Sequence, residues 1–145
     1  MRILILNGPN INLIGKREPS IYGNMPIDEY LASVCERFPE HVIDVFQSNH
    51  EGVLIDKLQE SIGVYDGIVF NPGGYSHTSI ALADTVRAIN IPVVEVHMSN
   101  VHAREEFRHH SVLSTVSAGS IAGFGVDSYL LGLRAACSLL ERKDA

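Results

Sequence analysis

The chain has 145 residues, a formal net charge of −6 at pH 7, 46% hydrophobic residues and 19% charged residues. This composition is typical of a single globular domain, 1–145, that is long enough to bury a core, and it argues against a disordered or low-complexity protein. The negative charge without a cluster of Lys and Arg argues against nucleic acid as a partner, and no uninterrupted apolar run is long enough to span a membrane.

Apolar runs alternate with stretches of helical periodicity along the chain. The predicted strands are 2–6, 42–46, 67–70, 92–96 and 120–124. The predicted helices are 27–38, 54–62, 80–89, 104–110 and a last one capped by Asp127. This alternation predicts an α/β fold, a flavodoxin-like three-layer sandwich. Its parallel sheet of five strands would have the order 2-1-3-4-5, with helices on both faces.

The first predicted strand begins at Arg2, directly after Met1, and the N-terminus lacks the small-residue cleavage site that a secretory signal would need. The chain has two cysteines, Cys35 and Cys137, and both fall on apolar faces of predicted helices. We therefore expect reduced, buried thiols and a cytoplasmic protein.

Polar clusters follow the first four predicted strands, so they are expected to meet at the carboxyl edge of the sheet, where ligands bind in such folds. The segment 7–23 is an unusually long connection, and it carries Asn10, Asn12, Arg17 and Tyr22. A nearby cation favours the phenolate, so an arginine beside a tyrosine can turn a phenol of pKa about 10 into a base.

The segment 71–78 combines Asn71, two glycines and His77 at the predicted start of a helix. Glycines let the backbone approach a ligand closely, and a helix N-terminus suits anions. His77 is therefore interpreted either as a ligand-binding residue or as a capping and packing residue. The segment 47–52 after the second strand is interpreted as a polar capping turn or as support for the site.

Glu95 and His97 are two residues apart on a predicted strand, so their side chains point to the same face. A carboxylate beside an imidazole fixes its tautomer and favours its protonated form, which suits a general acid. Ser99 and its backbone could hold a carboxylate. Together with the first loop, this pair suggests proton abstraction and acid-assisted elimination.

The predicted helix 104–110 places Arg104 and Arg108 one turn apart on one face, where they could bind an anion or form part of a solvated charged helix. The spacing of Glu106 and His109 is too weak a pattern for a metal site, and no metal is expected. Asp84, taken alone, is interpreted as a solvated helix carboxylate.

Several long segments resemble, in order, the type II 3-dehydroquinate dehydratase family. They are 7–23, 47–52, 71–79, 95–100 with 104–108, and 119–125. The resemblance covers nearly the whole chain. It implies a flavodoxin-like fold without flavin or any other cofactor. It also implies the reversible dehydration of 3-dehydroquinate to 3-dehydroshikimate in aromatic amino acid biosynthesis.

The resemblance also implies catalytic roles. Tyr22 would accept the proton from C2, and Arg17 would activate it and stabilise the transition state. Asn12 would hold a water molecule at the enolate oxygen. His97 would protonate the departing hydroxyl group, with Glu95 behind it.

Further residues would bind the substrate according to the same resemblance. They are Asn71, His77 and Arg108 at the ring hydroxyls, Met98 and Ser99 at the carboxylate, and Asp84 from a neighbouring subunit. The family pattern implies a dodecamer of four trimers. The first loop would close over the substrate as a lid.

Two other interpretations remain open from the residues alone. A flavodoxin-like module that binds a small anion or a nucleotide would need a phosphate loop rich in Ser, Thr and Gly after the first strand, and 7–10 lacks hydroxyl groups. A structural protein that forms oligomers would not need His77, His97, Arg17 and Tyr22 on converging loops.

Overall fold

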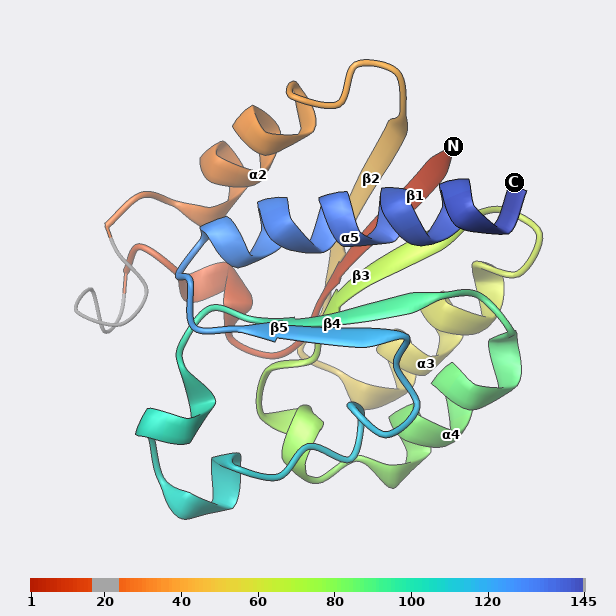
Figure 1. The fold of residues 1–145 in the computed structure, drawn as a ribbon. Helices are drawn as coiled ribbons and strands as arrows, with labels where there is room; N and C mark the ends of the chain where they lie inside the picture. Colours follow the sequence, from red (N-terminus) through yellow and green to blue (C-terminus); the bar gives the residue numbers. More distant parts are fainter. Residues whose placement is uncertain (17–23, 145) are drawn as a thin grey trace.

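The predicted strands form one parallel sheet in the computed structural model, which describes residues 1–16 and 24–144 (Figure 1). The strands are β1 (Arg2–Asn7), β2 (Val42–Gln47), β3 (Gly67–Asn71), β4 (Val93–His97) and β5 (Gly119–Ala122). Their order is β2-β1-β3-β4-β5, and every neighbouring pair is parallel. The predicted order of the sheet is therefore confirmed.

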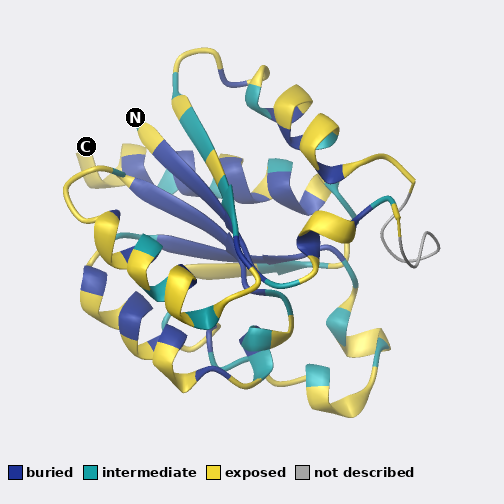
Figure 2. Ribbon diagram, turned by 180° about the vertical axis from the view of Figure 1, so that it is seen from behind, coloured by how far each residue is buried: buried dark blue, intermediate teal, exposed yellow. Residues whose placement is uncertain are grey.

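Helices cover both faces of this sheet, as predicted. On one face lie α2 (Ile27–Cys35) and α5 (Asp127–Asp144), and on the other lie α3 (Glu51–Glu60) and α4 (Ile80–Ile89) (Figure 1). Figure 2 shows the consequence for burial: the inner strands are dark blue along their length, and the outer sides of the helices are yellow. The protein is a three-layer α/β sandwich.

Side chains that alternate along β1 explain why two helical layers are needed. Ile3 and Ile5 pack against α2 and α5, whereas Leu4 and Leu6 pack against α3 and α4. Successive residues of a strand point to opposite faces, and a strand that is apolar at every position must be covered on both. All residues of β3 and β4 are buried, which places the core on both sides of the middle of the sheet.

The register of the strands aligns their carboxyl ends. Asn7 at the end of β1 pairs with Asn71 at the end of β3, and His97 at the end of β4 pairs with Ala122 of β5. Polar residues that terminate buried strands are thereby brought to one edge of the sheet. The site described below is built at this edge.

The prediction of one helix over 104–110 is wrong. The structure has two single turns of 3-10 helix here, η3 (Val101–Ala103) and η4 (Glu106–Arg108), and Arg104 between them has an extended backbone with φ −108° and ψ −164°. The Asn100 side chain caps η3 by accepting a hydrogen bond from the backbone N–H of His102 at 3.2 Å. Local side-chain bonds of this kind favour short turns over a continuous helix.

Other expectations can be compared with the structure directly. Cys137 is buried and Cys35 half-buried, and both are free thiols. Asp127, predicted as a cap, is the first residue of α5, and its carboxylate accepts a hydrogen bond from the Tyr30 hydroxyl of α2 at 2.8 Å. Within residues 1–16 and 24–144, no helix combines the length and the apolar character that crossing a membrane requires.

Candidate active site

The loops that follow β1, β3 and β4 enclose a cavity of about 130 Å³ at the carboxyl edge of the sheet. This is the edge at which the polar clusters were predicted to converge. The residues that line the cavity come from four segments: Pro9, Asn10, Ile11 and Ile14; Asn71, Gly73, Gly74 and His77; His97, Met98, Ser99 and Val101; and Arg104 and Arg108.

Backbone contact between two loops forms the floor of this region. The N–H of Gly8 donates to the carbonyl of Asn71 at 2.7 Å, and a Cβ added at Gly8 would lie 2.4 Å from the carbonyl oxygen of Pro72. Gly73 has φ +60°, and an added Cβ there would lie 2.9 Å from the carbonyl oxygen of Pro9. Only glycine allows both approaches, so the two loops hold each other in place.

Gly8→Ala is therefore expected to lower the free energy of unfolding by about 1–3 kcal/mol, because the loops must separate to admit the methyl group. Chemical denaturation measures this change. Gly52→Ala in α3 is the matched control: nothing lies within 4 Å of its added Cβ, and alanine favours a helix. Equal stability of the two variants would contradict the proposed loop contact.

The loop after β2 supports the loop after β1. Gln47 Nε2 donates to the Gly8 carbonyl at 3.2 Å and to Asn12 Oδ1 at 3.3 Å, while Asn49 Oδ1 accepts from the backbone N–H of Asn10 at 3.1 Å. Asn10 has a left-handed backbone with φ 69°. Both Asn10 and Asn12 are exposed, but only Asn10 lines the cavity.

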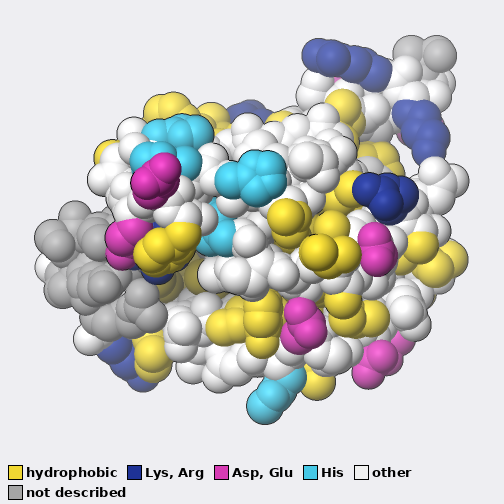
Figure 3. Space-filling model, turned by 90° about the horizontal axis from the view of Figure 1, so that it is seen from below, with side chains coloured by type: hydrophobic (Ala, Val, Ile, Leu, Met, Phe, Trp, Pro, Cys, Tyr) yellow, Lys and Arg dark blue, Asp and Glu magenta, His cyan; other side chains and the backbone are white. Residues whose placement is uncertain are grey.

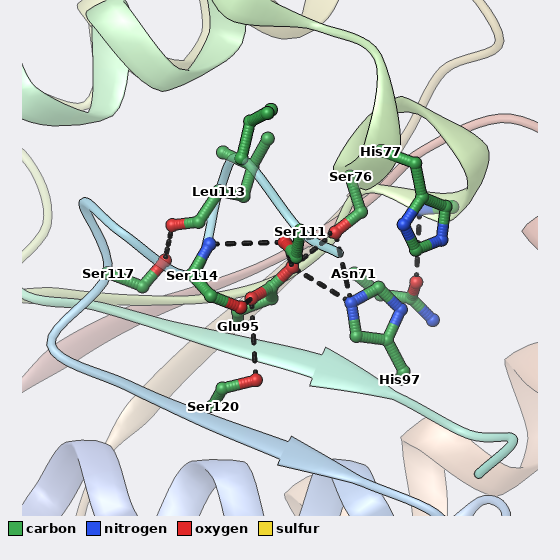
Figure 4. Close-up of polar contacts among 12 residues, drawn as sticks. Asn71, Ser76, His77, Glu95, His97, Ser111, Leu113, Ser114, Ser117 and Ser120 are labelled. Carbon is green, nitrogen blue, oxygen red and sulfur yellow. Dashed lines mark hydrogen bonds and ion pairs between the residues drawn. The ribbon is translucent and has the colours of Figure 1, made fainter. Parts of the chain in front are cut away.

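Glu95 and His97 lie on one face of β4, as predicted, and are joined by a hydrogen bond. His97 Nε2 lies 2.9 Å from Glu95 Oε1, and Glu95 is 1% exposed (Figure 4). The same carboxylate accepts hydrogen bonds from serine hydroxyl groups that surround it. They belong to Ser76, to Ser111 at 2.6 Å, to Ser114, and to Ser120 at 3.4 Å (Figure 4).

These contacts determine the charge of Glu95. Burial alone would raise its pKa, but the hydrogen bond and charge of His97 and the hydroxyls of Ser111 and Ser114 outweigh burial and lower the pKa to about 2. Glu95 is therefore ionised throughout the neutral range. A buried carboxylate fixed in this way can stabilise a positively charged imidazole beside it.

The pairing with Glu95 sets the tautomer of His97. Nε2 carries a hydrogen toward the carboxylate and also lies 3.1 Å from Ser76 Oγ. Since His97 lines the cavity and Nε2 is engaged away from it, Nδ1 is the nitrogen that can exchange a proton with a bound molecule. The arrangement is that of a general acid with a fixed partner.

His77 is the last residue of η2 (Gly73–His77) and stacks on His97, with ring centroids 6.0 Å apart. Its Nδ1 donates to the carbonyl of His110 at 2.8 Å, which leaves Nε2 as an acceptor. Burial lowers the pKa of His77, and the nearby charge of Arg108 adds to this effect. The neutral ring can thus accept a hydrogen bond from a ligand hydroxyl group.

The helix predicted over 80–89 is confirmed, and the segment 71–78 that leads into it contains the separate 3-10 turn η2. The helix α4 begins at Ile80, and the Ser79 hydroxyl caps it by accepting from the N–H of Leu82 at 3.0 Å. Ser79 also donates to Glu51 at 2.6 Å. The cavity is therefore lined by the 3-10 turn η2, and not by the first turn of α4.

Two guanidinium groups line the cavity although no single helix carries them. Arg104 Nη1 donates to Ser99 Oγ at 3.3 Å, and Arg108 Nε donates to Glu105 at 2.7 Å. Met98 is buried and completes this wall. The wall can supply positive charge and backbone N–H groups to a carboxylate or hydroxyl ligand.

The structure does not bring every predicted site residue to this cavity. Asp84 is exposed on α4 and forms an ion pair with Arg87 at 3.7 Å, away from the cavity of its own chain. Arg17 and Tyr22 lie outside the described residues. The described site therefore contains Asn71, His77, Met98, Ser99 and Arg108 beside the pair on β4.

Sequence analysis gave no role to the serines around Glu95. They come from η2, from the segment between η4 and β5, and from β5 itself, so no local motif connects them. Only the folded arrangement reveals them as a group. Asn10 lines the cavity and Asn12 of the same loop does not, a difference that spacing alone could not reveal.

Histidine side chains (cyan) and acidic side chains (magenta) lie near one another on the face shown in Figure 3. Proximity alone does not make a metal site, which needs three or more ligands at fixed geometry. Within the described ranges, no group of three or more His, Cys, Asp or Glu residues could hold a metal ion.

The chain is similar to known proteins in both sequence and fold. Residues 1–137 match the family model described as dehydroquinase class II. The chain is 54% identical over 144 residues to a 3-dehydroquinate dehydratase of Desulforudis audaxviator, covering 98% of this chain and 96% of the relative. It superposes on the crystal structure of a type II dehydroquinase from Butyrivibrio crossotus with a TM-score of 0.92 and 42% identity, covering 94% of this chain and 97% of the other.

Proposed function

Since the chain belongs to the class II dehydroquinase family, we propose that it catalyses the reversible dehydration of 3-dehydroquinate to 3-dehydroshikimate in aromatic amino acid biosynthesis. The observation that carries this proposal is the cavity itself, in which an anionic Glu95 holds His97 beside Asn71 and His77. These groups suit an elimination that needs an acid and several donors to a polyhydroxylated ring.

His97 acts as the general acid. The Glu95 carboxylate holds Nε2–H and stabilises the protonated ring, so the proton for the departing hydroxyl group comes from Nδ1 on the cavity side. As the C–O bond breaks, that oxygen takes the proton and leaves as water. The Glu95 carboxylate stays ionised through the cycle.

Tyr22 acts as the base and Arg17 as the cation that favours its phenolate. Both assignments rest on the family resemblance of 7–23, since the structure describes neither residue. The phenolate removes the proton from C2 beside the ketone, and the electrons form an enolate that then expels the hydroxyl group. Lowering a tyrosine pKa by about two units corresponds to about 2.7 kcal/mol, which one close cation in a partly dry site can supply.

A water molecule on Asn10 stabilises the enolate oxygen. The resemblance gave this role to Asn12, but Asn10 lines the cavity, and Asn12 Oδ1 is bonded to Gln47 outside it. The left-handed backbone of Asn10 also supports the assignment, because non-glycine residues in that conformation cluster at functional sites.

The substrate is held by the remaining cavity residues. Asn71, His77 and Arg108 bind the ring hydroxyls, and the segment of Met98 and Ser99 binds the carboxylate. No described lysine lines the cavity, so a covalent imine with the ketone is not part of the proposal. The elimination requires neither a cofactor nor a metal ion.

The assembly is proposed to be a dodecamer of four trimers in the cytoplasm. In one chain Asp84 is exposed and remote from the cavity, which fits the expectation that it serves the site of a neighbouring subunit. The exposed apolar side chain of Ile62, which lines the same surface hollow as Asp84, would be covered by such a contact.

A turnover assay tests the proposed function. Purified protein treated with a chelator is mixed with 3-dehydroquinate, and the ultraviolet absorbance of the conjugated enone product is followed. The absorbance is expected to rise without added metal or flavin. A flat absorbance with a folded protein would refute the activity, and a lysine adduct trapped by borohydride would refute the non-covalent route.

A further inference from the structure

A buried chain of hydrogen bonds joins the last helix to the floor of the cavity. Tyr129, in the first turn of α5, is fully buried and donates its hydroxyl hydrogen to Asn7 Oδ1 at 2.7 Å. The same hydroxyl oxygen accepts from Asn71 Nδ2 at 2.8 Å. Asn7 and Asn71 are adjacent in the sheet and are 2% and 3% exposed.

The direction of this chain of bonds is determined by the backbone. The N–H of Gly73 can only donate, and it lies 3.2 Å from Asn71 Oδ1. The other end of the Asn71 amide must therefore be the NH₂ group, which donates to Tyr129. The Tyr129 oxygen accepts this hydrogen bond, so its hydroxyl hydrogen is donated to Asn7 Oδ1. The donor and the acceptor of each hydrogen bond are therefore determined.

The consequence concerns what Asn71 presents to the cavity. Its amide plane is held by Gly73 on one side and by Tyr129 on the other, and Asn71 lines the cavity. One N–H of the amide and one lone pair of Oδ1 remain for a ligand. A ligand hydroxyl group can accept a hydrogen bond from this N–H and donate one to Oδ1 without any rotation of the Asn71 side chain.

We propose that Tyr129 is a positioning residue that orients the Asn71 amide for a substrate hydroxyl group. This proposal rests on the proposed function, in which Asn71 binds the ring. Tyr129 itself touches no reacting atom, because it is enclosed in the core between α5 and the sheet. Its effect on the reaction passes through Asn71 alone.

The variant Tyr129→Phe keeps the ring and removes the hydroxyl group. The buried Asn71 NH₂ group then loses its hydrogen-bond acceptor, and the amide is no longer held in the orientation that binds the substrate. We expect KM to rise about 5- to 30-fold. The kcat value and its pH profile are expected to remain nearly unchanged, because His97 and Glu95 are untouched. The matched control is Tyr30→Phe, which removes the hydrogen bond from α2 to Asp127 of α5 outside the cavity and should leave KM unchanged.

A double-mutant cycle separates positioning from a general loss of stability. If Tyr129 acts through Asn71, Tyr129→Phe should add nothing to the KM of Asn71→Ala. Asn7→Ala breaks the other end of the chain of bonds and serves as a second variant should Tyr129→Phe not fold. Full additivity, or a KM of Tyr129→Phe equal to that of Tyr30→Phe, would overturn the proposal.

Hydrogen exchange of the Asn71 side-chain amide gives a readout that does not depend on turnover. The NMR signals of this amide are identified by their absence in Asn71→Ala. They are expected to exchange slowly in the natural protein and faster in Tyr129→Phe, and equal exchange rates would overturn the orientation. If the natural protein does not turn over 3-dehydroquinate, the proposed function fails, while the exchange rates still decide whether Tyr129 holds Asn71.

Discussion

The variant His97→Ala is expected to lower kcat about 10²- to 10⁴-fold, the range that one positioned general acid contributes. This substitution removes the imidazole that Glu95 holds. Among the described residues, His97 is the only partner of the Glu95 carboxylate that lines the cavity. Without it, the departing hydroxyl group must leave as hydroxide or take its proton from water. The initial rate of enone formation at saturating substrate measures this loss.

A matched control is available on the same surface. His102→Ala changes an exposed histidine in η3 that does not line the cavity, and it should leave kcat unchanged. A companion variant, Glu95→Gln, keeps the shape of the side chain and removes its charge, and it should lower kcat less than His97→Ala does. A His97→Ala protein that retains the natural kcat would show that the acid lies elsewhere.

The variant Tyr22→Phe is expected to lower kcat about 10²- to 10⁴-fold, because the proposed base loses its only titratable atom. The ring remains, so binding and KM should change much less than kcat. Arg17→Ala should give a loss in the same direction, since the phenolate form of Tyr22 is then no longer favoured. Both are measured in the enone assay under saturating substrate.

The control for the phenol change is Tyr65→Phe. The Tyr65 hydroxyl donates to Asp44 at 2.8 Å, and neither residue lines the cavity. This variant loses a hydroxyl group and a hydrogen bond, but it should keep full activity. If Tyr22→Phe were as active as Tyr65→Phe, the assignment of the base would be wrong.

The sheet could be predicted from the sequence because its strands are short apolar runs between clear turns. Gly67–Asn71 and Val93–His97 are buried along their whole length, which is the pattern that a central parallel strand needs. The pair Glu95 and His97 could be predicted because a strand has a period of two, so residues two apart share a face. Strong local periodicity accounts for both successes.

The region from Arg104 to Arg108 could not be predicted in the same way. Its charges have helical spacing, yet the backbone turns are set by bonds from Asn100 and by the extended Arg104. Both arginines nevertheless line the cavity. The cavity thus receives both arginines, while the predicted helix that was to carry them is absent from 104–110.

Contacts between distant segments also could not be derived from spacing. The serines that hold Glu95 come from different loops, and Tyr129 reaches Asn71 across 58 positions in the chain. The proposal of Asn10 in place of Asn12 rests on the cavity lining and on the left-handed backbone of Asn10, which the sequence does not indicate. A proposed role of Asp84 in another subunit depends on an assembly beyond one chain.

A crystal structure of the protein with a bound, non-reacting analogue of 3-dehydroquinate tests the proposed mechanism most directly. We expect the analogue in the cavity, with Nδ1 of His97 within hydrogen-bond distance of the oxygen that departs and the Tyr22 oxygen, beside Arg17, facing C2. An analogue bound elsewhere, or one bound in the cavity with Tyr22 and Arg17 apart from each other and remote from C2, would contradict the mechanism.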